Sequence, residues 1–291
     1  KMVYYVCKEG QNPVCDEYKK YHIPFVNNAD IPDDENSLII FPEPTMSHLT
    51  MFNRAKLIMW WLSVDNWVTS CINKLNTFLQ CSMFDKSTFY HLIPLEYTGA
   101  RLTHWVQSEY ARIFLSLNGI NENKITFVGD YLDPVFLANT PRDISTEGRR
   151  DVILINRAKG FEYSRKLIAA APDLEWGMIA DMTAEQVANL LKSVKIYIDF
   201  GNHPGKDRLP REAAVSGCVI ITGRRGAANN SVDIPIPDEF KFVDNEENIM
   251  PIIDKIRYVL QNYESELEKQ KLYREQIFAE PPKFAAAVEA A

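Results

Sequence analysis

The stretch YIDFGNHPGKDRLPREAAVSGCVIIT, from Tyr197 to Thr222, decides how this chain folds. It places an apolar run before a loop rich in Gly, His, Lys, Asp and Arg, and then a segment with helical spacing and a second apolar run. Two apolar runs joined through a helix are typical of parallel strands in one sheet. A glycine loop between a strand and a helix N-terminus is also a geometry that suits an anion.

The core of this loop, Gly201 to Lys206, has the spacing G-x-x-x-G-K. A phosphate-binding P-loop has four residues between its glycines, and a Ser or Thr after the Lys that binds magnesium. Here three residues separate the glycines, and Asp207 follows the Lys. The sequence therefore excludes a P-loop but keeps the strand, the glycine loop and the helix N-terminus.

The composition is that of a globular protein with a sizeable core. The chain has 291 residues, of which 46% are hydrophobic and 24% charged, and this length suggests one large or two ordinary domains. The formal net charge of -7 argues against a nucleic-acid partner bound through broad charge neutralisation. The five cysteines form no C-x-x-C pair, so we expect reduced thiols and no zinc site.

No signal peptide is expected at the start of the chain. The most apolar run, residues 57–64, is too short to cross a bilayer. We therefore expect a cytoplasmic protein, and an association with the membrane surface stays open.

Strand-like and helix-like segments alternate along the chain, which is the signature of parallel sheets flanked by helices. In the first part we expect strands at 2–7, 37–41, 56–64, 102–108 and 124–129, and helices at 16–21, 66–79 and 108–119. In the second part we expect strands at 152–156, 174–179, 195–200 and 218–222, and helices at 161–172, 183–194 and 209–217.

A polar stretch at 138–151 interrupts this rhythm with Pro, Gly and charged residues, and we interpret it as an interdomain linker. The prediction is a first domain at 1–140, a second domain at 141–250, and C-terminal helices at 251–291 that cross back to the first domain. Within the tail, 251–278 is expected to form one or two long polar helices, and the final AAAVEAA is expected to fray.

Three loops of the second domain follow strands, and ligands of open α/β sheets bind beyond the carboxyl ends of the strands. The loops contain cations and glycines, which favour an anionic ligand such as a diphosphate. The alternative is a set of solvated loop charges, which the gathering of three loops at one edge disfavours. The candidate ligand-binding residues of these loops are Asn156, Arg157, Lys159, Gly160, His203, Gly205, Lys206, Arg208, Arg224 and Gly226.

Three carboxylates could take part in chemistry. Glu212 is expected in the first turn of its helix, where it either follows a helix-start preference or accepts hydrogen bonds from ribose hydroxyls. Glu43 and Asp65 follow strands of the first domain, and each could act as a general base at a cleft. The alternative for each is a turn residue or a helix cap.

Motifs absent from the sequence narrow the classes further. There is no G-x-G-x-x-G, no D-x-D and no G-x-S-x-G. These absences disfavour a classical dinucleotide fold, the manganese site of single-domain sugar transferases and a hydrolase nucleophile. We expect neither a metal nor a cofactor.

The segments NRAKG, LEWGMI, TAEQVANLLKSV, KIYIDF and LPREAAVSGCVIIT together resemble the nucleotide-sugar domain of GT-B glycosyltransferases. Lys159 and Gly160 match the family's Lys-Gly pair, which contacts the donor diphosphate, and Glu212 matches its donor-binding glutamate. The likeness covers about Leu102 to Phe242. It implies an α/β fold of two Rossmann-like domains facing a cleft, with a nucleotide sugar as donor and a glycan or lipid-linked glycan as acceptor.

One departure from the family concerns stereochemistry. Retaining members often carry an acidic residue eight positions before the donor glutamate, where this chain has Pro204. Retention or inversion of configuration therefore stays open. The loop that contains His203 and Gly205 is expected to hold the phosphate and ribose of the donor, and Asp65 or Glu43 is the expected base if the reaction inverts.

The prediction is a metal-independent glycosyltransferase whose cationic loops stabilise the leaving diphosphate. A non-catalytic module that binds a nucleotide or sugar is one alternative. A nucleotide-sugar epimerase on the same fold is another.

Overall fold

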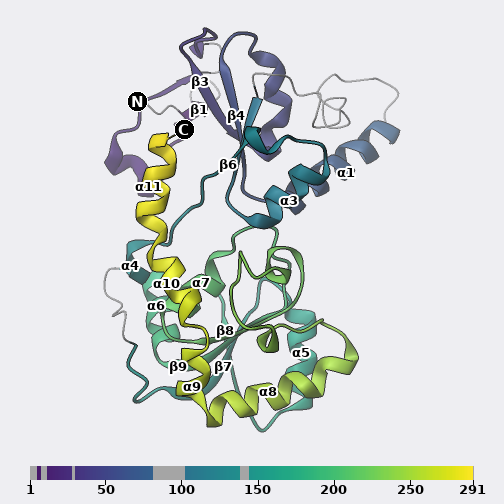
Figure 1. Ribbon diagram of the computed structural model, residues 1–291, viewed down its shortest axis with the longest axis vertical. Helices are drawn as coiled ribbons and strands as arrows, with labels where there is room; N and C mark the ends of the chain where they lie inside the picture. Colours follow the sequence, from purple (N-terminus) through teal and green to yellow (C-terminus); the bar gives the residue numbers. More distant parts are fainter. Residues whose placement is uncertain (1–4, 8–11, 28–29, 81–101, 138–143, 291) are drawn as a thin grey trace.

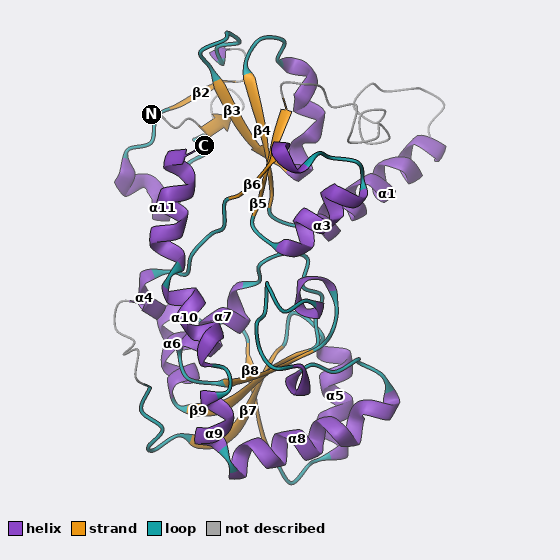
Figure 2. Cartoon of the chain, viewed as in Figure 1, coloured by secondary structure: helices purple, strands orange, loops and turns teal. Residues whose placement is uncertain are grey.

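The chain folds into two α/β halves, each built on a parallel four-stranded sheet, as the computed structural model shows in Figures 1 and 2. The structure describes residues 5–7, 12–27, 30–80, 102–137 and 144–290. The strands of the first sheet, in their order of pairing, are β3 (Leu38–Pro42), β4 (Lys56–Trp61), β5 (Leu102–Val106) and β6 (Ile125–Phe127). A separate parallel pair joins β1 (Tyr5–Cys7) to β2 (Phe25–Asn27).

The second sheet has the strand order β10-β9-β7-β8. Its strands are β7 (Arg150–Asn156), β8 (Glu175–Ile179), β9 (Val194–Asp199) and β10 (Val219–Thr222). Because every pair is parallel, the carboxyl ends of β10, β9 and β7 lie side by side at one edge of the sheet. The predicted fold class, two Rossmann-like domains followed by a helical tail, is confirmed.

Helices connect these strands and form the tail. The helices between strands are α1 (Val64–Gln80), α3 (Glu109–Leu117), α4 (Pro134–Leu137), α5 (Phe161–Ala170), α6 (Ala184–Lys192) and α7 (Arg208–Val215). The tail contains α8 (Ile249–Gln261), α9 (Tyr263–Glu268), α10 (Lys271–Phe278) and α11 (Glu280–Ala290). Short 3-10 helices lie at Asp16–Tyr21, Glu43–Met51, Glu122–Lys124, Gly226–Asn229, Asp238–Phe240 and Glu246–Asn248. Within the described ranges, no helix combines the length and apolar character that a bilayer crossing needs.

Local sequence explains most of these elements. Residues 196–198 of β9 have no exposed surface, because a parallel sheet covered by helices on both faces buries whole strands. The side chain of Ser108 accepts the N–H of Ala111 and begins α3. Thr183 and Gln186 form the expected capping box at the start of α6.

The strands predicted at 56–64, 102–108 and 124–129 are longer than the observed ones, and the first differs most. The apolar run at 56–64 was expected to be extended throughout, but β4 ends at Trp61 and α1 begins at Val64. The hydroxyl of Ser63 accepts the N–H of Asn66, and such capping starts the helix before the apolar run has ended.

The C-terminal tail differs from the prediction of one or two polar helices with a frayed end. Ile252 and Ile256 of α8 are buried in the core of the second half, so the helix has an apolar face. Helix α11 runs to the first half (Figure 1), where Phe284 stacks on Trp60 with ring centroids 6.4 Å apart. This packing gives the final helix a partner, which a frayed end would lack.

His104 lies in the core of the first half with 1% of its surface exposed. Its Nδ1 accepts the indole N–H of Trp61 at 3.0 Å. Burial lowers the pKa of His104 to about 4, and the charge of Lys124 adds to this shift. The folded protein therefore keeps a neutral ring at pH values where the unfolded chain takes up a proton.

Because of this histidine, we expect the free energy of unfolding to decrease as the pH falls. An unfolded His titrates near its ordinary pKa of 6.5, so the free energy of unfolding should fall by about 3 kcal/mol as the pH drops from 6.5 towards 4. Chemical denaturation at about pH 7 and about pH 4.5 measures this loss. In His104→Asn, whose amide oxygen can replace Nδ1 as acceptor, the loss should be smaller by that amount. An equal loss in both proteins would contradict the assignment.

Candidate functional site

Three loops meet at the carboxyl edge of the second sheet, and glycines make the contact possible. Gly160 has a φ of 68°, and a Cβ atom there would lie 2.4 Å from the backbone nitrogen of Gly201. Gly226 has a φ of 56°, and a Cβ atom there would lie 2.1 Å from the carbonyl oxygen of His203. A residue with a side chain fits neither position. The loops after β7, β9 and β10 therefore form one continuous surface.

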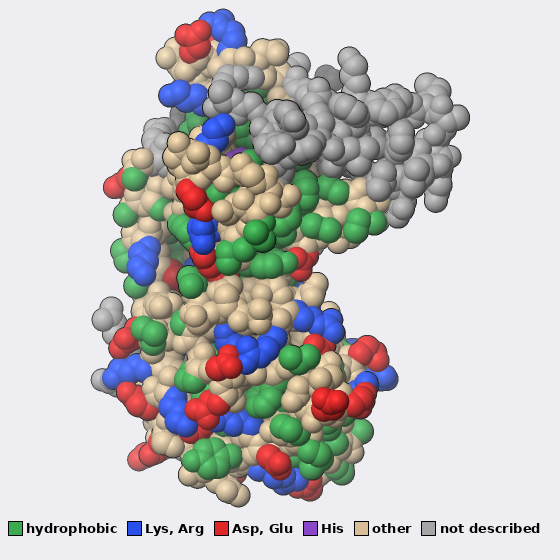
Figure 3. Space-filling view, turned by 45° about the vertical axis from the view of Figure 1, so that its right-hand side comes forward, with side chains coloured by type: hydrophobic (Ala, Val, Ile, Leu, Met, Phe, Trp, Pro, Cys, Tyr) green, Lys and Arg blue, Asp and Glu red, His purple; other side chains and the backbone are tan. Residues whose placement is uncertain are grey.

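This surface lies on the side of the second half that faces the first half. Figure 3 shows a hollow between the two halves, with Lys and Arg side chains beside it on the lower half. The first loop is closed into a turn by Asn156, whose side-chain oxygen accepts the N–H of Ala158 at 2.9 Å. The side chain of Asn156 therefore shapes the loop.

The cations on these loops differ in how they are paired. The Arg208 side chain is 68% exposed, and its Nε lies 3.9 Å from an oxygen of Asp130. Arg157 is exposed and forms no ion pair within the described part of the chain. Lys159 Nζ lies 3.0 Å from Asp207 Oδ1. Arg157 and Arg208 are thus the cations most accessible to a ligand.

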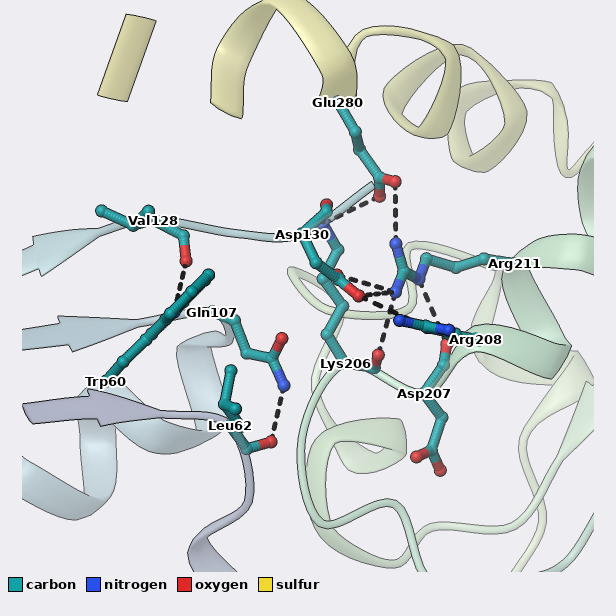
Figure 4. A network of polar contacts seen from close by, with 10 residues as sticks. All are labelled: Trp60, Leu62, Gln107, Val128, Asp130, Lys206, Asp207, Arg208, Arg211 and Glu280. Carbon is teal, nitrogen blue, oxygen red and sulfur yellow. Dashed lines mark hydrogen bonds and ion pairs between the residues drawn. The ribbon is translucent and has the colours of Figure 1, made fainter. Parts of the chain in front are cut away.

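Two other predicted cations already have close partners. Arg224 pairs with Asp238 at 2.7 Å. Lys206 Nζ pairs with Glu280 at 2.8 Å and lies 3.3 Å from the carbonyl oxygen of Asp130. Figure 4 shows Lys206 pointing toward Asp130 and Glu280, where the two halves meet. Its charge is therefore paired with Glu280.

Glu212 carries a half-buried carboxylate for which the described residues supply no hydrogen-bond partner. Helix α7 begins at Arg208 and has no acidic residue in its first turn, so the expected first-turn position of Glu212 is wrong. Because Arg208 and Glu212 are four positions apart, they lie on the same face of the helix. Burial raises the pKa of Glu212, and the charges of Arg208 and Arg211 oppose this shift.

His203 is fully buried inside the loop after β9. Its Nδ1 lies 3.1 Å from Asp207 Oδ2, and its Nε2 lies 3.7 Å from Asp199 Oδ1. Burial raises the pKa of Asp207, but His203 and Lys159 outweigh burial, so that pKa lies below its ordinary value. The imidazole reaches no surface in this structure, and it supports the loop from inside where the sequence suggested ligand contact.

The two candidate bases of the first half occupy different environments. Glu43 is 2% exposed and accepts the N–H of Leu62 at 3.0 Å, and burial raises its pKa against such backbone hydrogen bonds. Asp65 is half-buried at the start of α1. Its Oδ1 accepts the hydroxyl of Tyr110 at 2.8 Å, and its Oδ2 accepts the amide of Asn202 at 3.1 Å. Asp65 therefore faces the second half, whereas Glu43 is enclosed.

The loop after β9 touches the first half directly. The carbonyl oxygen of Pro204 accepts the N–H of Val64 at 3.0 Å. A Cβ atom on Gly205 would lie 2.3 Å from the carbonyl oxygen of Leu62, which also accepts the side-chain amide of Gln107 at 2.5 Å (Figure 4). Gly205 is thus needed for contact between the halves.

Arg211 joins three segments at the place where the two halves meet (Figure 4). It is 1% exposed and donates to both oxygens of Asp130, which follows β6, at 2.8 and 3.0 Å. It also donates to Glu280 at the start of α11 at 2.8 Å, and to the carbonyl oxygens of Lys206 and Asp207. Burial lowers the pKa of Arg211, but the two carboxylates outweigh this and keep it charged.

Sequence reasoning did not find this junction. Pro210, Ala213 and Ala214 are buried with Arg211 on α7, so the apolar spacing of the helix could have indicated a buried cation. Its partners lie 81 and 69 positions away along the chain. No local pattern identifies residues at such separations.

Comparison with known proteins finds no matching family model and no matching curated protein. Solved structures do match. TarM from S. aureus has a TM-score of 0.58 and 14% identity over 90% of this chain, which spans 56% of the TarM chain. HepE from Anabaena has a TM-score of 0.57 and 10% identity over 94% of this chain and 88% of its own. WaaG has a TM-score of 0.51 and 12% identity over 85% and 81% of the two chains.

TarM, HepE and WaaG are GT-B glycosyltransferases. This chain therefore has the GT-B fold that the sequence resemblance implied. At these identities the likeness concerns the fold.

We expect Arg211→Met to destabilise the protein by about 3 kcal/mol, because it removes the buried cation that both Asp130 and the buried Glu280 bind. Chemical denaturation measures the free energy of unfolding. Arg208→Met is the matched control on the exposed face of the same helix, and it should change that free energy by less than about 0.5 kcal/mol. Equal, small effects in both variants would show that the junction contributes little.

Proposed function

We propose that this protein is a glycosyltransferase that takes a sugar from a nucleotide-sugar donor. The observation that carries the proposal is the Glu212 carboxylate, which lies on the same helix face as the exposed Arg208, at the edge where three glycine loops meet. A carboxylate can accept hydrogen bonds from two ribose hydroxyls, and an arginine can bind phosphate through two parallel hydrogen bonds. The matching structures support this, since HepE was solved with UDP-glucose and TarM with UDP.

The donor diphosphate lies between the first two loops in this proposal. Arg157 and Arg208 are accessible, and Lys159 can leave Asp207 for a phosphate oxygen, so the three cations oppose the negative charge that develops on the leaving group. Gly160 begins α5 without a side-chain cap. The first N–H groups of that helix therefore have no capping side chain and can donate to the same anion.

Asp65 is the proposed base on the acceptor side if the reaction inverts. It is half-buried and faces the second half, whereas Glu43 is enclosed behind a backbone hydrogen bond. A glycan or lipid-linked glycan as acceptor, and an association with the membrane surface, stay predictions.

Metal-independent transfer is also part of the proposal. Within the part of the chain that the structure describes, no group of three or more His, Cys, Asp and Glu side chains is placed to hold a metal ion. The loop cations would neutralise the diphosphate in place of a metal ion.

A non-catalytic nucleotide-sugar-binding protein is the second candidate. Pro204 stands eight positions before Glu212, where retaining members often carry an acid, and its carbonyl oxygen binds the N–H of Val64 in the first half. This position therefore serves contact between the halves. Release of free nucleotide from a nucleotide sugar distinguishes the two candidates, because a binding protein saturates without forming product.

We expect one nucleotide class among UDP, GDP, dTDP and CMP, or its sugar, to raise the melting temperature in the presence of EDTA. A ligand at about 100 times its Kd stabilises the folded state by about 2.7 kcal/mol, which corresponds to about 4 °C for a protein of this size. Thermal unfolding with each ligand measures the shift. No shift from any of them would contradict the proposed donor site, and a shift that requires added metal would contradict metal independence.

We expect Arg208→Ala and Lys159→Ala each to weaken binding of that nucleotide about 10- to 100-fold, because each removes a charge-assisted hydrogen bond. Isothermal titration calorimetry measures the Kd. Arg165→Ala removes an exposed cation of α5 that pairs with Glu162, and it should leave the affinity unchanged. Melting temperatures within a few degrees of the parent protein exclude unfolding as the cause. Full affinity in both loop variants would refute the phosphate assignment.

A further inference from the structure

A carboxylate of the second half caps a helix of the first half. Asp233 follows the 3-10 helix Gly226–Asn229, and its two oxygens accept the backbone N–H groups of Glu109 at 2.7 Å and Tyr110 at 3.0 Å. These are the first residues of α3, and N–H groups in a first helical turn have no partner within the helix. A negative charge is favourable at that end of the helix.

The second half holds this carboxylate in place before it meets the helix. The Asn230 side-chain oxygen accepts the N–H groups of Val232 and Asp233, and its amide donates to Asp233 Oδ2 at 2.8 Å. Lys241 Nζ donates to the carbonyl oxygen of Asn230 at 2.7 Å. Lys241 is buried, and burial together with the charge of Arg224 lowers its pKa to about 8. The loop is therefore organised to present Asp233.

A residue of the capped helix also forms a hydrogen bond with Asp65. The N–H of Tyr110 binds Asp233, while its hydroxyl donates to Asp65 Oδ1 at 2.8 Å. The second oxygen of Asp65 accepts the amide of Asn202, which belongs to the loop after β9. One oxygen of Asp65 is thus held through a residue that the second half caps, and the other oxygen is held by the second half itself.

We infer that Asn202, Tyr110 and Asp233 are positioning residues that orient the Asp65 carboxylate when the two halves are in contact. The inference rests on the proposed function, in which Asp65 is the base. A carboxylate without these two bonds rotates freely, and the geometry of proton removal then varies. Because Asn202 lies in the loop after β9, which leads into Arg208 at the start of α7, the proposed donor contact of Arg208 and the orientation of Asp65 are linked through that loop.

Amide hydrogen exchange tests the contact without requiring any activity. The N–H groups of Glu109 and Tyr110 should be protected in the parent protein and exchange at least about tenfold faster in Asp233→Ala. The N–H of Ala111 binds Ser108 within the first half, so its exchange should not change. Val232→Ala, at an exposed neighbouring position, is the control variant. Equal exchange of the two amides in the parent protein and in Asp233→Ala would overturn the inference.

Steady-state kinetics with the nucleotide sugar that is turned over tests the positioning. Asn202→Ala and Tyr110→Phe should lower kcat about tenfold or more, with the KM for the donor within about threefold, because the donor contacts are intact. Asn202→Asp should be slower still, since it faces Asp65 with a like charge. Tyr110→Phe keeps its backbone N–H, so its exchange pattern should match the parent protein.

The outcomes separate this inference from the proposed function. No turnover of any nucleotide sugar by the parent protein would overturn the proposed function. Asp65 would then not be a base, and these residues would have no base to position. Turnover with an unchanged kcat in Asn202→Ala and Tyr110→Phe would overturn the inference alone. A raised KM at constant kcat would assign these residues to donor binding and would also overturn it.

Discussion

The charge of Arg211 is the constraint on which the arrangement of this molecule depends. A guanidinium keeps its proton in proteins, so one that is buried must find anionic partners. Arg211 finds them in Asp130, which belongs to the first half, and in Glu280, which begins the last helix (Figure 4). One side chain therefore links the first half, the second half and the tail at a single point.

The same helix supplies both the junction and the candidate site. Arg211 points inward on α7, whereas Arg208 is exposed and Glu212, four positions further along the helix, is half-buried. The carbonyl oxygens of Lys206 and Asp207 accept hydrogen bonds from Arg211. The loop that leads into α7 is thus held by the contact between the halves, and the shape of the site depends on that contact.

Much of the fold could be predicted because its signals are local. Strands β7 and β10 contain continuous buried apolar runs, since both faces of the sheet are covered there. The caps at Ser108 and Thr183 follow from side chains a few positions from the N–H groups they bind. The tail was predicted less well, because its overall polar composition gives little sign of the apolar face formed by the buried Ile252 and Ile256. Helical spacing alone does not show which face a neighbouring sheet will cover.

By itself, the sequence determined the α/β class, the order of the strands and helices, and the three glycine loops that carry cations. These features depend on hydrophobic periodicity and on the backbone freedom of glycine, which are properties of neighbouring residues. The tertiary structure alone decided which of these cations are paired and which are exposed. Lys206 and Arg208 are nearly adjacent and equivalent in the sequence, but Lys206 is paired with Glu280 and Arg208 is exposed. That difference arises because packing brings distant carboxylates to one side chain and leaves the other in solvent.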